Sequence, residues 1–316
     1  AHTSTAPIHS VTDLPVVFIA GPTASGKTEL AMRLADRCDV ELINVDAAQV
    51  YRGMDIGTAK LGSESLQRYP HALIDIRDPS QVYDASQFVR DARALIQRAH
   101  AQRRVPVLVG GTLFYFSALE NGVSRLPGAD PAIRAELEKE SDAIGWDGLY
   151  RKLEAIDPQL CRTVRAGDRQ RIQRALEIHR ITGKAPSLAM SESRPQPLEE
   201  RLYKFNLYTP DRSVLHARIE KRFEQMLEKG LIKEVEALRA RGDLHLDLPS
   251  MRCVGYRQVW QYLEGELDYA SMFMKGVAAT RQLAKRQLTW LRHQRGQIWL
   301  SSEYANNADL VLRFIP

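Results

Sequence analysis

The sequence predicts an α/β protein with a parallel sheet flanked by helices and an all-helical insertion. Three observations predict this class. A short apolar run is followed by a glycine-rich loop and then by a helical pattern. The order of strand, loop and helix recurs along the first part of the chain, as expected of a parallel sheet. After about residue 125 the strand signal stops and helical patterns replace it.

The glycine-rich loop, residues 21–28 (GPTASGKT), matches the phosphate-binding P-loop pattern in full. It follows a β-branched run at 16–20 and precedes helical spacing at 29–35. The glycines let several backbone N–H groups point at one anion, and the helix N-terminus adds partial positive charge. Lys27 can reach terminal phosphate oxygens, and Thr28 can hold a Mg²⁺ through its hydroxyl. The sheet is therefore P-loop NTPase-like, and its ligand is a di- or triphosphate.

Further strands are expected at residues 41–46, 71–75 and 105–109, with a helix at 85–104 between the last two. Asp46 ends the first of these strands, and Gly110-Gly111-Thr112 ends the third. Ligands of such sheets bind at the carboxyl ends of the strands. We therefore expect the P-loop, Asp46 and Thr112 to meet in one site.

The predicted domains follow from these patterns. Residues 1–13 are a flexible N-terminus. Residues 14–124 and 202–316 form the P-loop core domain, with strands at 202–208 and 298–300 and helices between them. Residues 125–201 begin at a cluster of Pro and Gly and show no strand pattern, so they form a helical insertion.

Composition limits the function classes. The 316 residues carry a formal charge of +5 and a pI near 9.1, which permits a nucleic-acid partner. The three cysteines are far apart, so neither a zinc site nor a disulfide framework is expected, and a reducing cytoplasm fits best. No apolar run reaches the length of a membrane span, and the first residues show no signal peptide. The histidines show no metal-ligand spacing.

Several side chains could carry chemistry. Asp46, at the end of a strand beside the P-loop, can act as a general base or as a turn cap. Arg218 and Arg222 share one helical face, where either can clamp a leaving diphosphate, or both can be solvated and paired with Glu residues. Cys253 has no nearby base, so we interpret it as a buried thiol.

Two helices are rich in Arg and Gln, at residues 169–174 and 281–293. Their charges suit phosphate contacts and their amides suit base edges, although a charged helix face is often only solvated. Trp290 in the second helix can stack on a base or pack in the core. Two such helices in one basic chain favour polynucleotide binding.

These motifs together resemble the bacterial tRNA dimethylallyltransferase family, also called tRNA isopentenyltransferases. The similarity covers nearly the whole chain, through GPTASGKT at 21–28, DAAQVYRGMDIGTAK at 46–60, HALIDIRDP at 71–79, GGTLFY at 110–115, DRQRIQRALE at 168–177, RCVGYRQ at 252–258 and TRQLAKRQLTWLR at 280–292.

The resemblance implies an activity. Dimethylallyl diphosphate would occupy the P-loop, with Mg²⁺ on Thr28, and its dimethylallyl group would pass to N6 of the adenosine at tRNA position 37, beside the anticodon. Asp46 is implied as the general base, Thr23 as a positioning residue and Arg218 as the diphosphate arginine, with Arg222 close enough to be confused with it. The helical insertion would clamp the anticodon stem-loop. The enzyme would be a cytoplasmic monomer with no membrane contact.

The resemblance also implies binding residues. The diphosphate would contact Arg218 and the loop residues Gly21, Pro22, Thr23, Ala24, Ser25, Gly26, Lys27 and Thr28. The tRNA would contact Asp46, Ala47, Ala48, Gln49, Thr112, Arg134, Gln170, Arg171, Ile172, Gln173, Arg174, Arg252, Cys253, Val254, Gly255, Tyr256, Arg257, Lys285, Arg286, Gln287, Leu288, Thr289, Trp290, Leu291 and Arg292.

The chain departs from the family at Ala47, where Ser is usual, so one hydroxyl contact is missing. The zinc finger of eukaryotic relatives is also absent. Two other functions are compatible with parts of the sequence. A small-molecule kinase would use ATP at the P-loop and Asp46 to activate a hydroxyl, but it leaves the Arg- and Gln-rich helices unexplained. A non-enzymatic RNA-binding module with a nucleotide switch would not need Asp46.

Overall fold

Six parallel strands form one sheet in the structure, a computed structural model that describes residues 13–316. Their spatial order is β3-β2-β4-β1-β5-β6, and each neighbouring pair is parallel. Strands β1, β2 and β4 are buried along their whole length, as the apolar runs require. The predicted fold class is confirmed. The strands cover Val16–Ala20 (β1), Val40–Val45 (β2), His71–Ala72 (β3), Val105–Gly110 (β4), Leu202–Tyr208 (β5) and Gln297–Ser301 (β6).

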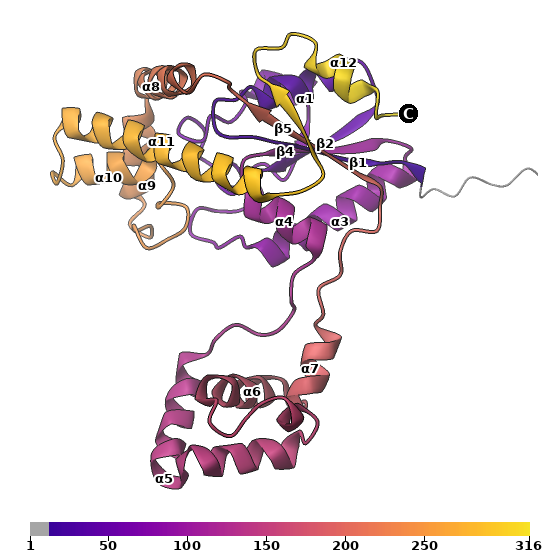
Figure 1. The fold of residues 1–316 in the computed structure, drawn as a ribbon. Coiled ribbons are helices and arrows are strands. Elements are labelled where there is room, and N and C mark those ends of the chain that lie inside the picture. The colour runs from indigo at the N-terminus through magenta and orange to yellow at the C-terminus, as the bar shows by residue number, and fades with distance from the viewer. Residues whose placement is uncertain (1–12) are drawn as a thin grey trace, which may run out of the picture. The chain divides into compact units, whose positions relative to one another are not determined.

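Helices connect these strands and form the insertion (Figure 1). Those of the core are Lys27–Ala35 (α1), Ser63–Arg68 (α2), Ala85–Ala101 (α3), Leu113–Asn121 (α4), Arg212–Glu228 (α8), Leu231–Ala240 (α9), Tyr256–Leu263 (α10), Tyr269–His293 (α11) and Asn307–Leu312 (α12). Those of the insertion are Pro131–Ile156 (α5), Arg169–Thr182 (α6) and Pro186–Glu192 (α7), with a 3₁₀ turn at Leu160–Arg162 (η2).

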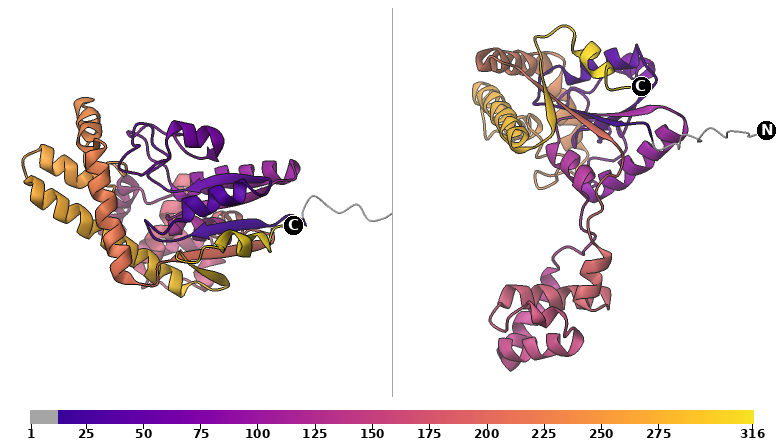
Figure 2. Two further views of the ribbon diagram at one scale, coloured as in Figure 1. Left: turned by 90° about the horizontal axis from the view of Figure 1, so that it is seen from above. Right: turned by 45° about the vertical axis from the view of Figure 1, so that its right-hand side comes forward.

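The sheet lies between two layers of helix. On one face α1 and α12 pack against side chains such as Val17 and Ile19 of β1. The other face carries α3 and α4, and Phe18 of β1 meets Phe116 of α4 with ring centroids 4.9 Å apart. Successive residues of β1 thus point to opposite layers. The two layers are seen in Figures 1 and 2.

Both edge strands differ from the central ones. Strand β3 covers two residues, whereas the sequence predicts a strand over 71–75. Leu73 has a φ of 66°, and this left-handed backbone ends the pairing with β2. At the other edge, β6 pairs with β5 alone, so the expected edge strand near the C-terminus is present.

Helices α8 to α11 form a separate group of the core unit. Helix α11 packs against α8 and α10, and α10 packs against α9. Side chains of α8 and α11 line the same cavity as the P-loop and the ends of β2 and β4. The group therefore covers the carboxyl edge of the sheet, where the sequence places the site.

Residues 121–197 form a compact unit distinct from the rest of the chain, against the 125–201 expected from the sequence. Its core contains Leu137 and Leu153 of α5 and Leu176 of α6. Glu177, fully buried, accepts hydrogen bonds from Arg134 and Arg174, and these bonds lower its pKa to about 2 although burial opposes them. This carboxylate ties the start of α5 to α6.

The two core segments that flank the insertion are bonded to each other. The backbone N–H of Leu198 donates to the carbonyl of Glu120 at 2.9 Å. Lys204 of β5 also pairs with the Glu120 carboxylate. The expected flexible N-terminus, 1–13, falls outside the described residues apart from Asp13. Within residues 13–316 no helix combines the length and apolar character that crossing a bilayer requires.

Candidate active site

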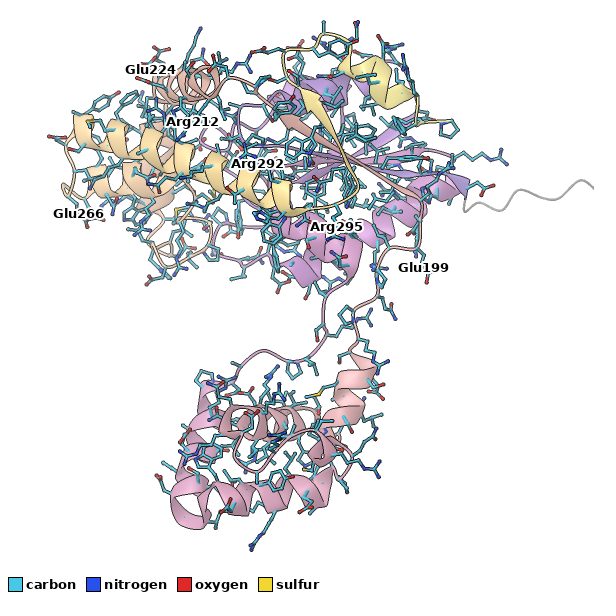
Figure 3. The ribbon with its side chains drawn as sticks, viewed as in Figure 1. Glu199, Arg212, Glu224, Glu266, Arg292 and Arg295 are labelled. Atoms are coloured by element: carbon cyan, nitrogen blue, oxygen red, sulfur yellow. The ribbon has the colours of Figure 1, made fainter. Side chains whose placement is uncertain are left out.

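A cavity of about 880 Å³ opens at the carboxyl edge of the sheet. Its walls come from the P-loop, from the ends of β2 and β4, from α8, from α11 and from the loop before α10. The P-loop, Asp46 and Thr112 all line it, so the predicted meeting of three sequence-distant segments is observed. Figure 3 shows the side chains of this unit.

The P-loop supplies a buried cation. Gly26 has a φ of 84°, which turns the loop into the first residue of α1. Lys27 Nζ donates to the carbonyl of Pro22 at 3.0 Å. Burial and the nearby Arg222 charge lower the pKa of Lys27 to about 8, and Asp46 partly opposes them. The lysine therefore stays largely protonated at neutral pH and lines the cavity together with Asp46 and Arg222.

Asp46 is both a turn cap and a cavity residue. Its Oδ1 accepts from the backbone N–H of Ala48 at 2.8 Å and of Gln49 at 3.3 Å. Within the described residues its Oδ2 has no hydrogen bond. The hydroxyl of Thr112 accepts from the N–H of Ala47 at 2.9 Å, which fixes the turn on both sides. The cap thus orients the carboxylate and leaves one oxygen for a ligand.

The structure separates the two candidate arginines. Arg222 lines the cavity, where burial lowers its pKa, the charge of Asp46 raises it, and its own charge depresses the pKa of Lys27. Arg218 is exposed one turn earlier, with its guanidinium 3.5 Å from Thr209 Oγ1 and 3.4 Å from Ser302 Oγ. It does not line the cavity. The geometry therefore favours Arg222, where the sequence favours Arg218.

The loop after β2 is held by α9 and α10. Glu234 accepts from the backbone N–H of Ile56 at 2.9 Å and of Gly57 at 3.4 Å, and it also accepts from the Tyr256 hydroxyl. Gln49, which lines the cavity, donates to the carbonyl of Thr58 at 3.0 Å. The loop that presents Gln49 is thereby fixed to the helical group.

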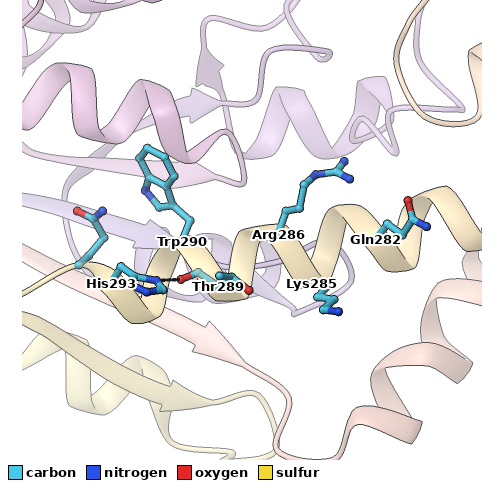
Figure 4. Close-up of a pocket in the computed structure, with 7 residues that line it drawn as sticks. Gln282, Lys285, Arg286, Thr289, Trp290 and His293 are labelled. Atoms are coloured by element: carbon cyan, nitrogen blue, oxygen red, sulfur yellow. Dashed lines mark hydrogen bonds between the residues drawn. The ribbon is translucent and has the colours of Figure 1, made fainter.

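The exposed face of α11 borders the cavity with a groove of about 640 Å³. Arg286 and Trp290 belong to both the groove and the cavity. Figure 4 shows these two side chains on one side of α11, with Lys285 on the other. His293 Nδ1 lies 2.7 Å from the carbonyl of Thr289. A basic and aromatic surface thus leads into the site, and Trp290 is exposed rather than core.

Most of the predicted tRNA contacts fall into three groups. Residues that line the cavity are Asp46, Ala47, Ala48, Gln49, Thr112, Arg252, Cys253, Val254, Gly255, Arg286, Gln287 and Trp290. Arg134 and Arg174 bind the buried Glu177, while Gln170 and Arg171 are exposed on the insertion.

The third group corrects the prediction. The side chains of Ile172, Tyr256 and Leu291 are at most 3% exposed, so they cannot be tRNA-contacting side chains. Each lies on the inner face of an amphipathic helix whose outer face is charged. Cys253 has a pKa raised to about 12, chiefly by burial and then by Asp46, so its thiol stays protonated, as a non-nucleophile should.

The residues present fit a Mg²⁺ held jointly with a ligand. Among residues 13–316 no group of three or more His, Cys, Asp or Glu side chains is arranged to bind a metal. A P-loop ion instead uses one hydroxyl and phosphate oxygens. Thr28 lines the cavity beside Lys27 and offers that hydroxyl.

Comparisons with known proteins give the relationship. A sequence model described as IPP transferase matches residues 49–294. A full-length tRNA isopentenylpyrophosphate transferase of Bacillus halodurans is 36% identical, with a TM-score of 0.70 over 96% of this chain and 95% of that one. The chain belongs to the IPP transferase family. A tRNA delta(2)-isopentenylpyrophosphate transferase of Staphylococcus epidermidis is 30% identical, with a TM-score of 0.66 over 95% and 96% of the two chains.

A more distant match is a eukaryotic dimethylallyltransferase acting on tRNA, at 26% identity and a TM-score of 0.70. It covers 94% of this chain and 76% of the eukaryotic one. The resemblance found in the sequence is therefore confirmed at the level of the IPP transferase family.

Sequence reasoning missed two features of this IPP transferase-family site. Glu234 carried no motif, although a Glu in the first turn of a helix is well placed to accept backbone N–H groups. Gln287 was grouped with tRNA contacts because the family resemblance implies that role for residues 285–292, yet it is buried. Its neighbours Ala284 and Leu291 share the buried face, and that spacing was the available signal.

Proposed function

We propose that this chain transfers the dimethylallyl group of dimethylallyl diphosphate to N6 of the adenosine at tRNA position 37, giving N6-isopentenyladenosine and diphosphate. The proposal rests on membership of the IPP transferase family and on the names of its solved relatives. The observation that carries it is the cavity that holds a P-loop lysine, an arginine and a carboxylate with one free oxygen, with a basic groove at its rim.

The diphosphate half of the donor occupies the P-loop in this proposal. The backbone N–H groups and Lys27 bind its oxygens, and Arg222 approaches from α8. Thr28 would hold a Mg²⁺ together with the diphosphate oxygens, and that ion would supply further positive charge against the leaving group. These groups stabilise the charge that develops as the allylic carbon–oxygen bond breaks.

Asp46 serves the other half of the reaction. The N6 amine is a weak nucleophile because its lone pair is delocalised into the adenine ring. As N6 bonds to the allylic carbon, the free Oδ2 of Asp46 accepts the N6 proton, and diphosphate departs with the electrons of the broken bond. The turn at Ala48 and Thr112 fixes the carboxylate for this transfer.

The adenine must leave its stack to enter the cavity. This costs a few kcal/mol, and less in a loop than in a duplex. Backbone contacts to the exposed face of α11, and to Arg171 on the insertion, offset that cost. Trp290 at the rim is placed to stack on an unpaired base.

A transfer assay tests the proposal. Unmodified tRNA is incubated with the protein, Mg²⁺ and either dimethylallyl diphosphate or ATP, and the digested nucleosides are analysed by mass spectrometry. We expect prenylated adenosine with the diphosphate alone. Turnover of ATP without a prenylated product would establish the kinase alternative instead.

The lowered pKa of Lys27 predicts a pH dependence of diphosphate binding. Lys27 is charged below a pKa of about 8, so affinity is full there and falls as the pH rises through that value. The loss approaches tenfold per pH unit, in proportion to the charged fraction. Calorimetric titration of inorganic diphosphate between pH 6.5 and 9.5 measures it. The ligand's own ionisation cancels in the ratio of wild-type to Lys27→Met affinity, and a flat ratio would contradict the prediction.

Lys285 on the exposed face of α11 predicts a change in salt dependence. Lys285→Ala should weaken tRNA binding and reduce the slope of log affinity against log salt by roughly one unit. Lys275→Ala is the matched control, because Lys275 is exposed on the same helix and lines neither the groove nor the cavity. Filter binding over a salt series gives both slopes. Equal slopes for the two variants would mean that Lys285 is a solvated side chain that does not contact tRNA phosphate.

A further inference from the structure

One buried amide joins the P-loop to the end of β4. Gln287 of α11 is 8% exposed. Its Oε1 accepts from the backbone N–H of Thr23 at 3.1 Å, and its Nε2 donates to the carbonyl of Gly111 at 2.9 Å. Both ends of the side chain are therefore used inside the protein, one on each of two segments that line the cavity.

The surroundings are shaped for this amide. A Cβ on Gly111 would lie 2.7 Å from Gln287 Nε2, 3.3 Å from the carbonyl oxygen of Gly21 and 3.7 Å from Lys27 Cε. A side chain at position 111 would thus displace the amide or the P-loop. Only a residue with a donor and an acceptor at the same reach satisfies Thr23 and Gly111 together, and Gln is such a residue.

Thr23 belongs to the loop whose other N–H groups would bind the diphosphate, and its own N–H is taken by Gln287. The bond to Gln287 orients this peptide and sets the spacing between the first turn of the loop and β4. Lys285 and Arg286 of α11 line the groove, and Gln287 of the same helix bonds to the P-loop. One helix therefore contributes to both features.

We infer that Gln287 is a positioning residue that holds the P-loop in its diphosphate-binding shape, and that it is not a tRNA contact. The inference rests on the proposed function for the identity of the ligand. Removal of the amide takes the protein partner from the Thr23 N–H and from the Gly111 carbonyl, both on half-buried residues, so the loop relaxes toward other conformations. Loss of the Gln287 amide therefore affects prenyl transfer only by changing the conformation of the P-loop.

Gln287→Leu tests this, with Gln97→Leu on the exposed face of α3 as the matched control. Amide hydrogen exchange of the free protein should rise in peptides that contain Thr23. The affinity for inorganic diphosphate should fall about tenfold, while that for tRNA stays within about twofold. Gln97→Leu should change none of these quantities.

These readouts separate the inference from the proposed function, since exchange and diphosphate binding need no transfer. If no prenylated product formed with wild-type protein, they would still decide the role of Gln287. Weakened tRNA binding with unchanged exchange at Thr23 would overturn the inference.

Gln287→Glu gives a second test if the leucine variant does not fold. One carboxylate oxygen still accepts from Thr23, but the other faces the Gly111 carbonyl and is repelled while ionised. Protonation restores the donor, and burial raises the pKa of this carboxyl while the nearby Lys27 charge opposes that rise. The deficit in diphosphate affinity relative to wild type should therefore shrink as the pH falls from 8 to 5.5. A deficit that is constant over this range, or absent, would contradict the positioning role.

Discussion

Asp46→Asn is expected to lower the rate of prenyl transfer by roughly a thousandfold, within the range for loss of a general base. The amide oxygen can still accept from Ala48 and Gln49, so the turn after β2 keeps its shape. The free position can no longer take the N6 proton. Single-turnover transfer with saturating tRNA and dimethylallyl diphosphate measures the chemical step.

The binding affinities of Asp46→Asn separate catalysis from positioning. Affinity for tRNA should be unchanged, and affinity for inorganic diphosphate should be equal or higher, because a negative charge near Lys27 and Arg222 is gone. Asp247→Asn, on an exposed carboxylate, is the control. A variant that transferred normally but bound tRNA weakly would reduce Asp46 to a turn cap with an RNA contact.

Arg222→Ala is expected to lower kcat/KM for dimethylallyl diphosphate by about 10²- to 10³-fold, the effect of removing one donor to a developing oxyanion. Arg218→Ala should change it by no more than about threefold, since an exposed arginine outside the cavity contributes little. The two residues lie one turn apart on α8, so each variant controls for helix propensity and total charge in the other.

Arg222 should also affect the pH dependence of diphosphate binding. Its charge lowers the pKa of Lys27, so Arg222→Ala should move the pH dependence of diphosphate binding to higher pH. Arg218→Ala should leave that profile where it is. If instead Arg218→Ala caused the large kinetic loss, the arginine preferred from the sequence would be the diphosphate clamp.

The parts of the site that follow strand ends could be predicted from the sequence. A parallel sheet brings the carboxyl ends of its strands to one edge, so the P-loop, Asp46 and Thr112 were certain to lie near each other once the strands were recognised. The short β3 could not be predicted, because the left-handed φ of Leu73 comes from its surroundings and not from its residue type.

The choice between neighbouring residues on one helix required the packing. Arg218 and Arg222 repeat at helical spacing, and only the packed structure shows that Arg222 lines the cavity while Arg218 lies near Thr209 and Ser302. Gln287 lies among exposed basic residues of α11, in a segment to which the family resemblance assigns tRNA contact. The helical spacing with Ala284 and Leu291 indicates its burial, but its bonds to Thr23 and Gly111 depend on how closely the P-loop approaches the end of β4, which no local pattern encodes.

The join between Glu120 and Leu198 has an evolutionary consequence. The two residues where the insertion departs and returns are already hydrogen-bonded to each other, so the strands on either side keep their register whatever lies between. The entropic cost of a longer excursion grows slowly, by about 0.6 kcal/mol for each doubling of its length. Residues 121–197, which contribute no side chain to the cavity, thus form a segment that natural selection, or an engineer, can exchange at a single junction.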